Sequence, residues 1–512
     1  MMDKAISNKR IKNALISVFY KEPAKNLIEE LHKNGVTIYS TGGTLDYIKK
    51  LGIEAESIEN LTGYPSIFGG RVKTLHPKVF GGILARSEKE EDRAQLKEFE
   101  IPEFDLVVVD LYPFEETLKS DAAHQEIIEK IDIGGISLIR AAAKNYKNCC
   151  IVPSQEYFDE ITEIIKKQNA ETSIEQRKYF AGAAFNVSSH YDTAIFSYFN
   201  EDSEFDVFKH SILNSKTLRY GENPHQWGKF YGNYDDIFKQ LNGKELSYNN
   251  ILDIDAAFSL MSEFTEPSFA IIKHSNACGM ASRATIEEAW EAALASDPVS
   301  AFGGILFANR NITEKNAYQI NELFFEVIIA PDFEKEALNI LCSKKNRIIL
   351  QLNKASYPAK LFRTALNGVL CQKRDDTMTP PDQWQMITKQ KPDSKQIEDL
   401  LFANKLVKHT KSNAIVLVKD KQLIGSGTGQ TSRVDALMHA IAKAKEHGHN
   451  TEGAVMASDA FFPFPDCVEI ADKEGIKSVI QPGGSLKDNL SIEYCNNNNL
   501  SMVFTGTRHF KH

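Results

Sequence analysis

The sequence predicts an α/β protein built on an open parallel sheet with helices on both faces. Strand-like and helix-like stretches alternate between residues 11 and 150, and the alternation returns from about residue 400. Leu106 to Val109 is a continuous apolar run, which is typical of a strand buried on both faces of a parallel sheet. Alternation of this kind predicts parallel strands, because each right-handed crossover lays a helix on one face of the sheet.

The individual elements follow from apolar spacing and from the positions of proline and glycine. Pro23 to Lys33 is expected to be a helix, because proline is tolerated in a first turn. Another helix should follow Ser40-Thr41-Gly42-Gly43-Thr44 and run through Leu51. The remaining expected strands are Ala14 to Phe19, Val36 to Ser40, Phe269 to Ile272, Phe325 to Ala330, Ala414 to Val418 and Val503-Phe504, and the remaining expected helices are Ile136 to Lys144 and residues 155–200.

Two polar stretches are expected to connect folded parts of the chain. Glu201-Asp202-Ser203-Glu204 is acidic, which places a linker near residues 200–210. Asp375 to Lys391 is polar and contains Pro380-Pro381, so it should form a surface connection between subdomains.

Length and composition indicate a soluble globular protein of several domains. The chain has 512 residues, which at ~150 residues per domain corresponds to about three units. Hydrophobic residues make up 42% and charged residues 25%, as in proteins with ordinary cores. The net charge of -9 argues against broad binding to nucleic acid or anionic membranes, although a local basic pocket for phosphate remains open.

Cysteine usage and the start of the chain indicate a cytoplasmic protein with reduced thiols. The seven cysteines are odd in number and form no C-x-x-C, which argues against a disulfide framework and a paired-cysteine zinc site. Met1-Met2-Asp3-Lys4 lacks an apolar signal core, and no run of ~18 apolar residues occurs. Reduced thiols are the norm in that compartment.

Two stretches of the first half are suited to holding a phosphate. In Ser40-Thr41-Gly42-Gly43-Thr44, the glycines let the backbone close around an anion at a helix start, and three hydroxyls add donors. An ordinary turn with a helix cap is the alternative. In Gly69 to Pro77, Arg71 and Lys73 should lie on one side of the chain, which suits a phosphate. An ordinary exposed basic loop is the alternative.

Two further stretches of the first half carry polar side chains beside apolar elements. Asp110-Leu111-Tyr112 follows the apolar strand, and ligands bind at the carboxyl ends of strands in open α/β sheets. Asp132 precedes Gly134-Gly135, and Lys144 lies on the helix that follows. An ordinary surface lysine is the alternative for Lys144.

In the second half, Lys273 and His274 stand at the end of a buried apolar strand. Burial lowers the pKa of a lysine and imidazole titrates near neutrality, so the pair suits proton transfer. A solvated strand end is the alternative. Gly425, Gly427 and Gly429 lack the spacing of a dinucleotide loop. Met456 to Asp466 combines phenylalanines and carboxylates, which suits a flat heterocycle but also an apolar core turn.

Together these stretches resemble the bifunctional purine biosynthesis family that joins phosphoribosylaminoimidazolecarboxamide (AICAR) formyltransferase to inosine monophosphate (IMP) cyclohydrolase. The resemblance covers essentially the whole chain in order, and its motifs are specific only as a set. They are S-T-G-G-T, G-R-V-K-T-L-H-P, D-I-G-G followed by R-A-A-A-K-N, L-R-Y-G-E-N-P-H-Q, D-P-V-S-A-F-G-G, S-D-A-F-F-P-F and the terminal R-x-F-x-H.

The resemblance implies a domain order. Residues 1–150 would be a methylglyoxal-synthase-like cyclohydrolase domain and 151–210 a helical connector. Residues 211–512 would be the transformylase, made of two cytidine-deaminase-like subdomains at approximately 211–380 and 381–512. Zinc is not expected, because a zinc deaminase shows H-x-E and P-C-x-x-C, whereas His274 and Cys278 have no C-x-x-C partner.

The implied activity is formyl transfer from 10-formyltetrahydrofolate to AICAR, followed by dehydrative cyclisation of formyl-AICAR to IMP. The family also implies a cytoplasmic homodimer with the transferase site at its interface. No nucleic-acid or membrane partner is implied, and a bound monovalent cation is left open.

By resemblance, His274 transfers the proton in the formyl transfer, and Lys273 tunes it, stabilises charge or protonates the leaving folate nitrogen. The other residues implied for transfer are Arg219, Tyr220, Asn413, Arg433, Phe461, Phe464 and Asp466 in the pocket, with Arg508 and a catalytic His512 in the tail. For cyclisation, the implied binding residues are Ser17, Lys21, Thr41, Gly42, Gly43, Thr44, Arg71 and Thr74, and the implied catalytic residues are Lys73, Tyr112, Asp132 and Lys144.

The chain departs from the family pattern at a few positions. Phe19-Tyr20 stands where Ser-Asp is usual, Asp110 replaces an asparagine, and Ala277 replaces a proline. Two other functions compete with the bifunctional one: a phosphate-ligand lyase like methylglyoxal synthase on an inert partner, and a non-catalytic nucleotide sensor. Both are disfavoured because residues for both reactions are retained.

Overall fold

The computed structural model describes residues 8–201, 205–353 and 357–512. The chain forms two compact units, Met1–Leu213 and Asn214–His512. Part of the predicted acidic linker, residues 202–204, lies outside the described residues. Each unit is described separately below.

Unit 1 is built on a five-stranded sheet of order β4-β3-β2-β5-β6, and every pair in it is parallel. Its strands are β2 (Asn13–Val18), β3 (Thr37–Ser40), β4 (Glu56–Ser57), β5 (Leu106–Asp110) and β6 (Cys150–Val152). The predicted parallel sheet is therefore confirmed. The chain runs outward from β2 to β4 and then returns to β5 on the other side of β2. Right-handed crossovers then place the helices before and after this reversal on opposite faces.

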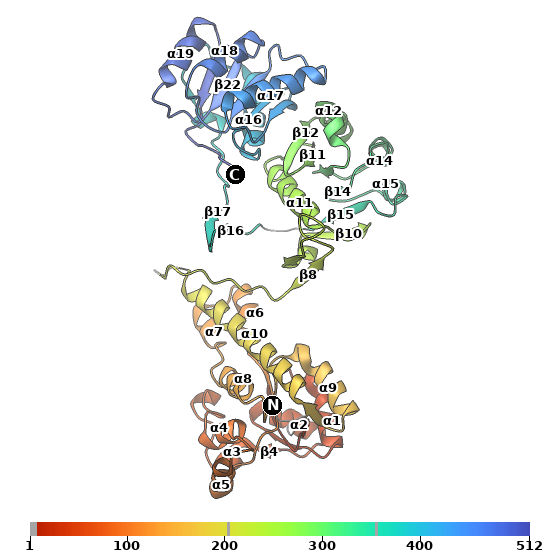
Figure 1. The fold of residues 1–512 in the computed structure, drawn as a ribbon, viewed down its shortest axis with the longest axis vertical. Coiled ribbons are helices and arrows are strands. Elements are labelled where there is room, and N and C mark those ends of the chain that lie inside the picture. Colours follow the sequence, from red (N-terminus) through yellow and green to blue (C-terminus); the bar gives the residue numbers. More distant parts are fainter. Residues whose placement is uncertain (1–7, 202–204, 354–356) are drawn as a thin grey trace. The chain divides into compact units, whose positions relative to one another are not determined.

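The helices of unit 1 pack in two groups (Figure 1). α1 (Lys25–Lys33) contacts α9 (Phe158–Lys167), and α8 (Gly134–Lys144) contacts both α4 (Pro77–Leu84) and α10 (Ile174–Phe199). The helix predicted to start at Pro23 begins as a 3-10 turn, Glu22–Ala24, and α8 already starts at Gly134. The other helices are α2 (Gly42–Lys50), α3 (Ile58–Thr62), α5 (Glu90–Glu98), α6 (Phe114–Lys119) and α7 (His124–Ile128).

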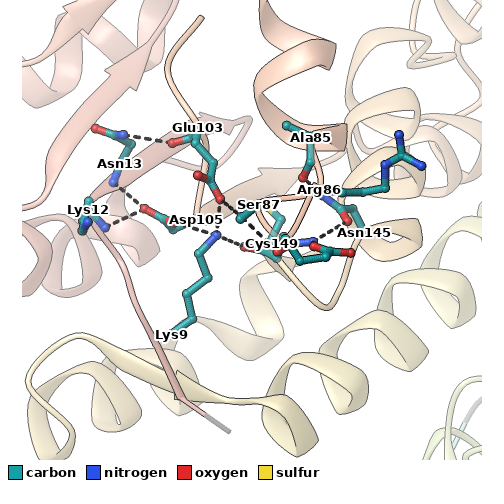
Figure 2. Close-up of polar contacts among 12 residues, drawn as sticks. Lys9, Lys12, Asn13, Ala85, Arg86, Ser87, Glu103, Asp105, Asn145 and Cys149 are labelled. Carbon is teal, nitrogen blue, oxygen red and sulfur yellow. Dashed lines mark hydrogen bonds and ion pairs between the residues drawn. The ribbon is translucent and has the colours of Figure 1, made fainter. Parts of the chain in front are cut away.

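A network of charged and polar groups ties β1 (Asn8–Arg10) to the amino-terminal edge of this sheet (Figure 2). The Lys9 ammonium lies 3.0 Å from the Asp105 carboxylate, pairs with Glu103 and donates to the Asn148 carbonyl at 2.6 Å. Asp105 also accepts from the backbone N–H groups of Lys12 and Asn13 at 2.8 and 3.1 Å. This edge fixes strand positions and lies opposite the strand ends that carry the candidate site.

Unit 2 is built on a twelve-stranded sheet whose two halves repeat one plan. In the first half, the antiparallel hairpin of β11 (Ser268–Lys273) and β12 (Asn276–Ser282) precedes the parallel strands β13 (Ile305–Ala308), β14 (Val327–Ala330) and β15 (Ile348–Leu352). The second half has the hairpin of β19 (Ile415–Lys419) and β20 (Gln422–Gly427), then β21 (Val455–Ser458), β22 (Ser478–Gln481) and β23 (Ser501–Phe504). The halves join where β12 pairs with β20.

Helices with strong amino-terminal caps flank these strands. α11 (Tyr248–Met261), α12 (Ile286–Ser296) and α16 (Ser394–Lys408) each begin with a capping box. α17 (Arg433–Glu446) packs against β20. The remaining helices are α13 (Pro298–Ala301), α14 (Glu314–Asn321), α15 (Lys335–Leu341), α18 (Asp466–Lys473) and α19 (Asp488–Asn497), and the remaining strands are β8 (Ser215–Leu218), β9 (Gly228–Tyr231) and β10 (Phe238–Asn242).

The polar stretch 375–391 is more ordered than the predicted surface connection. It contains the short edge strand β18 (Gln385–Met386), which pairs with β23. Trp384 beside that strand is only 6% exposed. Most of its other side chains are exposed or half-buried, and the stretch links β17 to α16, so it is a surface connection that also contributes an edge strand. The hairpin of β16 (Lys360–Ala365) and β17 (Gly368–Lys373) was not predicted.

Candidate active sites

A cavity of about 710 Å³ lies at the carboxyl ends of the strands in unit 1. Ser17 to Phe19 end or follow β2, Thr41 follows β3, and Asp110 and Tyr112 end or follow β5. The strand order reverses between β2 and β5, and ligands of open α/β sheets bind at such a reversal. Of the predicted residues, those that line the cavity are Ser17, Lys21, Thr41, Gly43, Thr44, Arg71, Lys73, Thr74, Tyr112 and Asp132.

Two lysines face the start of α2 inside this cavity. A side-chain carbon on Gly42, which has a φ of +50°, would lie 3.7 Å from the Lys73 ammonium. One on Gly43 would lie 3.3 Å from the last methylene carbon of Lys21. Glycine therefore lets both cationic side chains approach the helix start, where unpaired N–H groups already favour an anion. The arrangement suits a phosphate.

The hydroxyls beside this helix start do not serve as free donors. Thr41 donates to Glu59 at 2.5 Å, Thr44 to the Val18 carbonyl at 3.0 Å, and Ser40 to the Ile16 carbonyl at 2.8 Å. The expectation of hydroxyl donors for an anion is thereby corrected, because burial makes each hydroxyl find a protein acceptor. Burial alone would raise the pKa of Glu59, but hydrogen bonds from Ser57 and Thr41 and the charge of Lys73 lower it.

Asp132 and Tyr112 are the titratable groups on the far side of the cavity. The Gly135 N–H donates to Asp132 at 2.6 Å, and a side-chain carbon at Gly135 would collide with that carboxylate at 2.7 Å. Burial raises the pKa of Asp132, an effect partly offset by hydrogen bonds from the Gly135 and Tyr112 N–H groups and by the charge of Lys73. Burial and the Asp132 charge raise the pKa of Tyr112. A carboxylate whose pKa is raised suits proton transfer when it lies beside lysines that can bind an anion.

Three of the departures from the family pattern, Phe19, Tyr20 and Asp110, lie together in unit 1, whereas Ala277 lines the cavity of unit 2. The Phe19 ring makes edge contacts with Tyr20 and Tyr112 at 4.9 and 5.5 Å between centroids. The Asp110 carboxylate accepts from the Tyr20 N–H at 3.1 Å, and burial raises its pKa. The substitutions therefore support one another, because the added acid binds the backbone beside the added aromatic ring.

Other predicted residues of unit 1 lie apart from the cavity or at its rim. Lys144 is exposed at the end of α8 and does not line the cavity. The exposed side chain of Arg71 pairs with Glu129. Tyr191 of α10 was missed, although its hydroxyl accepts from the Asp132 N–H at 2.9 Å and donates to the Lys130 carbonyl at 2.7 Å. A tyrosine in a helix of aromatic and small residues gave no local sign of this contact.

In unit 2, His274 and Ser275 form the two-residue loop of the β11–β12 hairpin. Lys273 pairs with Asn276 across the loop, and φ is 53° at His274 and 61° at Ser275. Positive φ at both positions defines the turn that two-residue hairpins prefer, and it normally calls for Asn-Gly. A residue other than glycine in this region is strained by about 1–3 kcal/mol. His274 is thus held at the tip of a strained turn.

A cavity of about 360 Å³ opens beside this turn. Lys273 and His274 line it, and the Lys273 ammonium donates to the Phe302 carbonyl. Burial, followed by the charge of Asp297, raises the pKa of Cys278 to about 12, so this thiol stays protonated near neutrality. The remaining lining residues are Asn276, Ala277, Ser296, Asp297, Ser300, Leu423, Gly425, Ser426, Thr428 and Lys443.

Arg433 and Asn413 form a second polar cluster with Asp459, which sequence reasoning had not singled out. The Arg433 guanidinium lies 2.7 Å from the Asp459 carboxylate and donates to the Asn413 side chain at 3.1 Å and to the Phe461 carbonyl at 3.3 Å. The Asp459 side chain is fully buried. Arg433 is therefore held in place by a buried carboxylate.

The carboxyl-terminal tail is held against the loop that carries Asn413. Ser412 and Lys511 exchange hydrogen bonds at 2.9 and 3.0 Å, and the His509 N–H donates to the Asp459 carbonyl at 3.1 Å. This loop also reaches the turn, because the Lys411 N–H donates to the Asn276 side chain at 2.9 Å. The exposed His512 is fixed only loosely, with its carbonyl accepting from Arg363 at 3.4 Å.

Several predicted transferase residues do not line the cavity at His274. Arg219 donates to the neighbouring Tyr220 hydroxyl at 3.0 Å. Exposed Phe464 lies under the Lys487 ammonium at 4.1 Å, and the Asp466 carboxylate accepts from the N–H of the next residue. Arg508 lies 4.4 Å from the Phe510 ring centroid. The structure thus brings together Lys273 and His274, and separately Asn413, Arg433 and Phe461.

Among residues 8–201, 205–353 and 357–512, no group of three or more His, Cys, Asp or Glu side chains is arranged to hold a metal ion. Within the same ranges, no helix has the length and apolar character required to cross a membrane.

Comparison with known proteins gives matches along the chain. Residues 142–443 match the family described as AICARFT/IMPCHase bienzyme, and residues 24–137 match the family described as MGS-like domain. "Bifunctional purine biosynthesis protein PurH" of Bacteroides thetaiotaomicron is 58% identical over 99% of this chain and 99% of its own length. The protein of that name from Caldicellulosiruptor bescii is 46% identical over 98% of this chain and 100% of its own.

One solved structure, described as "Crystal structure of ForH", matches 37% of this chain and 98% of its own, with 32% identity and a TM-score of 0.33. That likeness is too loose to carry an argument about the fold.

Proposed function

Because the chain belongs to the AICARFT/IMPCHase bienzyme family, we propose that its two units divide the two reactions of that family between them. The chain is a bifunctional enzyme of purine biosynthesis with AICAR formyltransferase and IMP cyclohydrolase activities, and its amino-terminal domain is MGS-like. The observation that carries the division is that each unit has its own cavity lined by titratable side chains. Cyclisation is assigned to unit 1 and formyl transfer to unit 2.

Formyl transfer requires a base, because the AICAR amine is a poor nucleophile whose lone pair is delocalised into the ring. The amine nitrogen attacks the formyl carbon of 10-formyltetrahydrofolate, and the bond from that carbon to the folate nitrogen then breaks. His274 accepts the amine proton, and Lys273 stabilises the oxyanion or supplies the proton that the folate nitrogen takes up. Support comes from both side chains lining one cavity at the hairpin tip.

Cyclisation is intramolecular, so positioning supplies much of its rate. The carboxamide nitrogen attacks the formyl carbon and gives up one proton. The formamide nitrogen then gives up its own proton, the C=N bond forms, and the former formyl oxygen leaves as water. Lys21, Lys73 and the start of α2 hold the ribosyl phosphate, while Asp132 and Tyr112 move the amide proton and assist the departing oxygen. The support is that these groups line one cavity of about 710 Å³.

The domain boundaries and the oligomeric state are part of the same proposal. The domains are those stated above, 1–150, 151–210 and 211–512 with two cytidine-deaminase-like subdomains, and the repeated strand plan of unit 2 is compatible with such a pair. The enzyme works as a cytoplasmic homodimer. A bound monovalent cation is the part of the family resemblance that this proposal leaves open.

Product analysis tests the proposal. The purified full chain is incubated with AICAR and 10-formyltetrahydrofolate, and products are separated by chromatography. IMP is the expected product. Accumulation of formyl-AICAR would show an inactive cyclohydrolase, and binding without turnover would show a sensor; either result would contradict the proposal.

The pH dependence of cyclisation should report Asp132. Its pKa is raised by burial, so the carboxylate takes up a proton at a higher pH than an ordinary aspartate of pKa about 3.9. If the ionised form is the base, the rate of cyclisation of supplied formyl-AICAR falls on acidification at a pH above that value. Asp132→Asn should lower the rate about 100-fold and flatten this limb. An acid limb at or below the ordinary value would contradict the assignment.

Deleting His512 should slow formyl transfer by about tenfold while leaving the fold intact. The described contacts of this residue are a 3.4 Å hydrogen bond to its carbonyl and a ring contact with Phe510, so little stability is lost. Transfer kinetics and thermal unfolding of the truncated chain provide the measurement. A truncated chain that transfers at the full rate would remove His512 from the proposed site.

A further inference from the structure

A carboxylate on α11 holds the turn that carries His274. Asp253 Oδ1 accepts from the Ser275 N–H at 2.7 Å and from the Ser275 hydroxyl at 3.2 Å. Asp253 Oδ2 accepts from the His274 N–H at 3.3 Å. One side chain therefore binds the backbone of both central residues of the hairpin loop, from a helix 21–22 residues earlier in the chain.

The loop depends on such a partner because its own residues do not favour it. His274 and Ser275 both have positive φ, which glycine adopts freely and other residues adopt under strain. The opposite side of the loop is held as well: Asn276 donates to the His274 carbonyl at 2.8 Å and accepts from the Lys411 N–H at 2.9 Å. The peptide groups on both sides of His274 are therefore fixed by side chains.

We propose that Asp253 is a positioning residue for formyl transfer, acting through the backbone of the His274 turn. Asp253 does not line the cavity, so it acts on the reaction only by holding the imidazole where the amine proton leaves. The inference rests on the proposed role of His274. It adds that the orientation of His274 is set by α11 and not by the hairpin alone.

Substitution of Asp253 in the full chain tests the proposal. Asp253→Ala should lower kcat for formyl transfer about 100-fold, because a misplacement of about 1 Å has that effect on a catalytic group. The KM for AICAR should change by less than about threefold, because Asp253 itself does not line the cavity. Asp253→Asn retains one acceptor oxygen and should lose only about tenfold. Cyclisation of supplied formyl-AICAR should be unchanged.

Glycine at the loop provides the decisive readout. Adding Ser275→Gly to Asp253→Ala should restore kcat about tenfold, since glycine adopts positive φ without the carboxylate. If Asp253→Ala acted only by destabilising the fold, Ser275→Gly would not restore kcat measured at saturating substrate. Wild-type kcat in Asp253→Ala, an equal loss of cyclisation, or no recovery with Ser275→Gly would each overturn the proposal.

A matched control removes the effect of charge. Asp382 is exposed in the 3-10 turn Pro381–Gln383, and Asp382→Asn makes the same chemical change away from the hairpin. It should transfer formyl groups at the wild-type rate, and a loss equal to that of Asp253→Asn would overturn the proposal. If the unaltered chain transfers no formyl group, both the proposed function and this inference are wrong. If the unaltered chain transfers formyl groups and Asp253→Ala does so at the same rate, only this inference is wrong.

Discussion

His274→Ala is expected to lower formyl transfer at least 1,000-fold and to leave cyclisation of supplied formyl-AICAR within about twofold of wild type. General-base catalysis supplies ~10²–10⁴ in rate, and the AICAR amine is too weak a nucleophile to react without it. Among the described residues lining the cavity, the other groups that could take a proton are poorly suited. Lys273 is engaged with the Phe302 carbonyl, and the Cys278 thiol is buried with its pKa raised to about 12. Asp297 and Lys443 are paired with each other at 3.1 Å.

The measurement is a pair of initial rates, one for each half-reaction, on the same preparation. His439→Ala serves as the control, because His439 is an exposed histidine of α17 that does not line the cavity. It should retain both rates. Loss of both activities in a folded His274→Ala protein would refute the separation of the reactions between the units.

Lys73→Ala should have the reverse effect, lowering cyclisation about 100- to 1,000-fold while formyl transfer continues and formyl-AICAR accumulates. If Gly42 and Gly70 carried a side-chain carbon, that carbon would lie 3.7 and 3.6 Å from the Lys73 ammonium. Lys73 is therefore central to the proposed phosphate site at the start of α2. Its charge also lowers the pKa values of Asp132 and Glu59. Removing it weakens the hold on the phosphate and raises the pKa of Asp132 further.

The same two rates measured on Lys49→Ala provide the control. Lys49 is exposed in the last turn of the same helix, α2, so the substitution removes an equal charge far from the helix start. Cyclisation should proceed at the wild-type rate in this variant. Equal losses of cyclisation rate in Lys49→Ala and Lys73→Ala would mean that net charge, and not the phosphate site, determines the rate.

Part of the unit 1 cavity follows from the parallel strands of the sheet. Strand ends meet at one edge of a parallel sheet, so Lys21, Thr41 and Tyr112 had to gather there once the strands were recognised. The directions of the hydroxyls could not be predicted in this way. Thr41 and Thr44 donate to protein acceptors, a choice made by burial and packing and not by a local motif.

The residues that hold the second site in place were harder to predict from the sequence. Asp253 binds the His274 turn across 21 residues, and Asp459 pairs with Arg433 across 26. Contacts at such separations depend on how elements pack, so no spacing rule identifies them. The strain at His274 was equally hidden, because histidine and serine give no local signal for a turn that normally requires asparagine and glycine.

Mixing the two inactive variants tests the central claim most directly. His274→Ala and Lys73→Ala are each incubated with AICAR and 10-formyltetrahydrofolate, alone and together, and IMP is measured. Each variant alone should form almost no IMP, whereas the mixture should form it readily, because one variant makes the formyl-AICAR that the other cyclises. No IMP from the mixture, or IMP from either variant alone, would contradict two separate sites for two reactions in one chain.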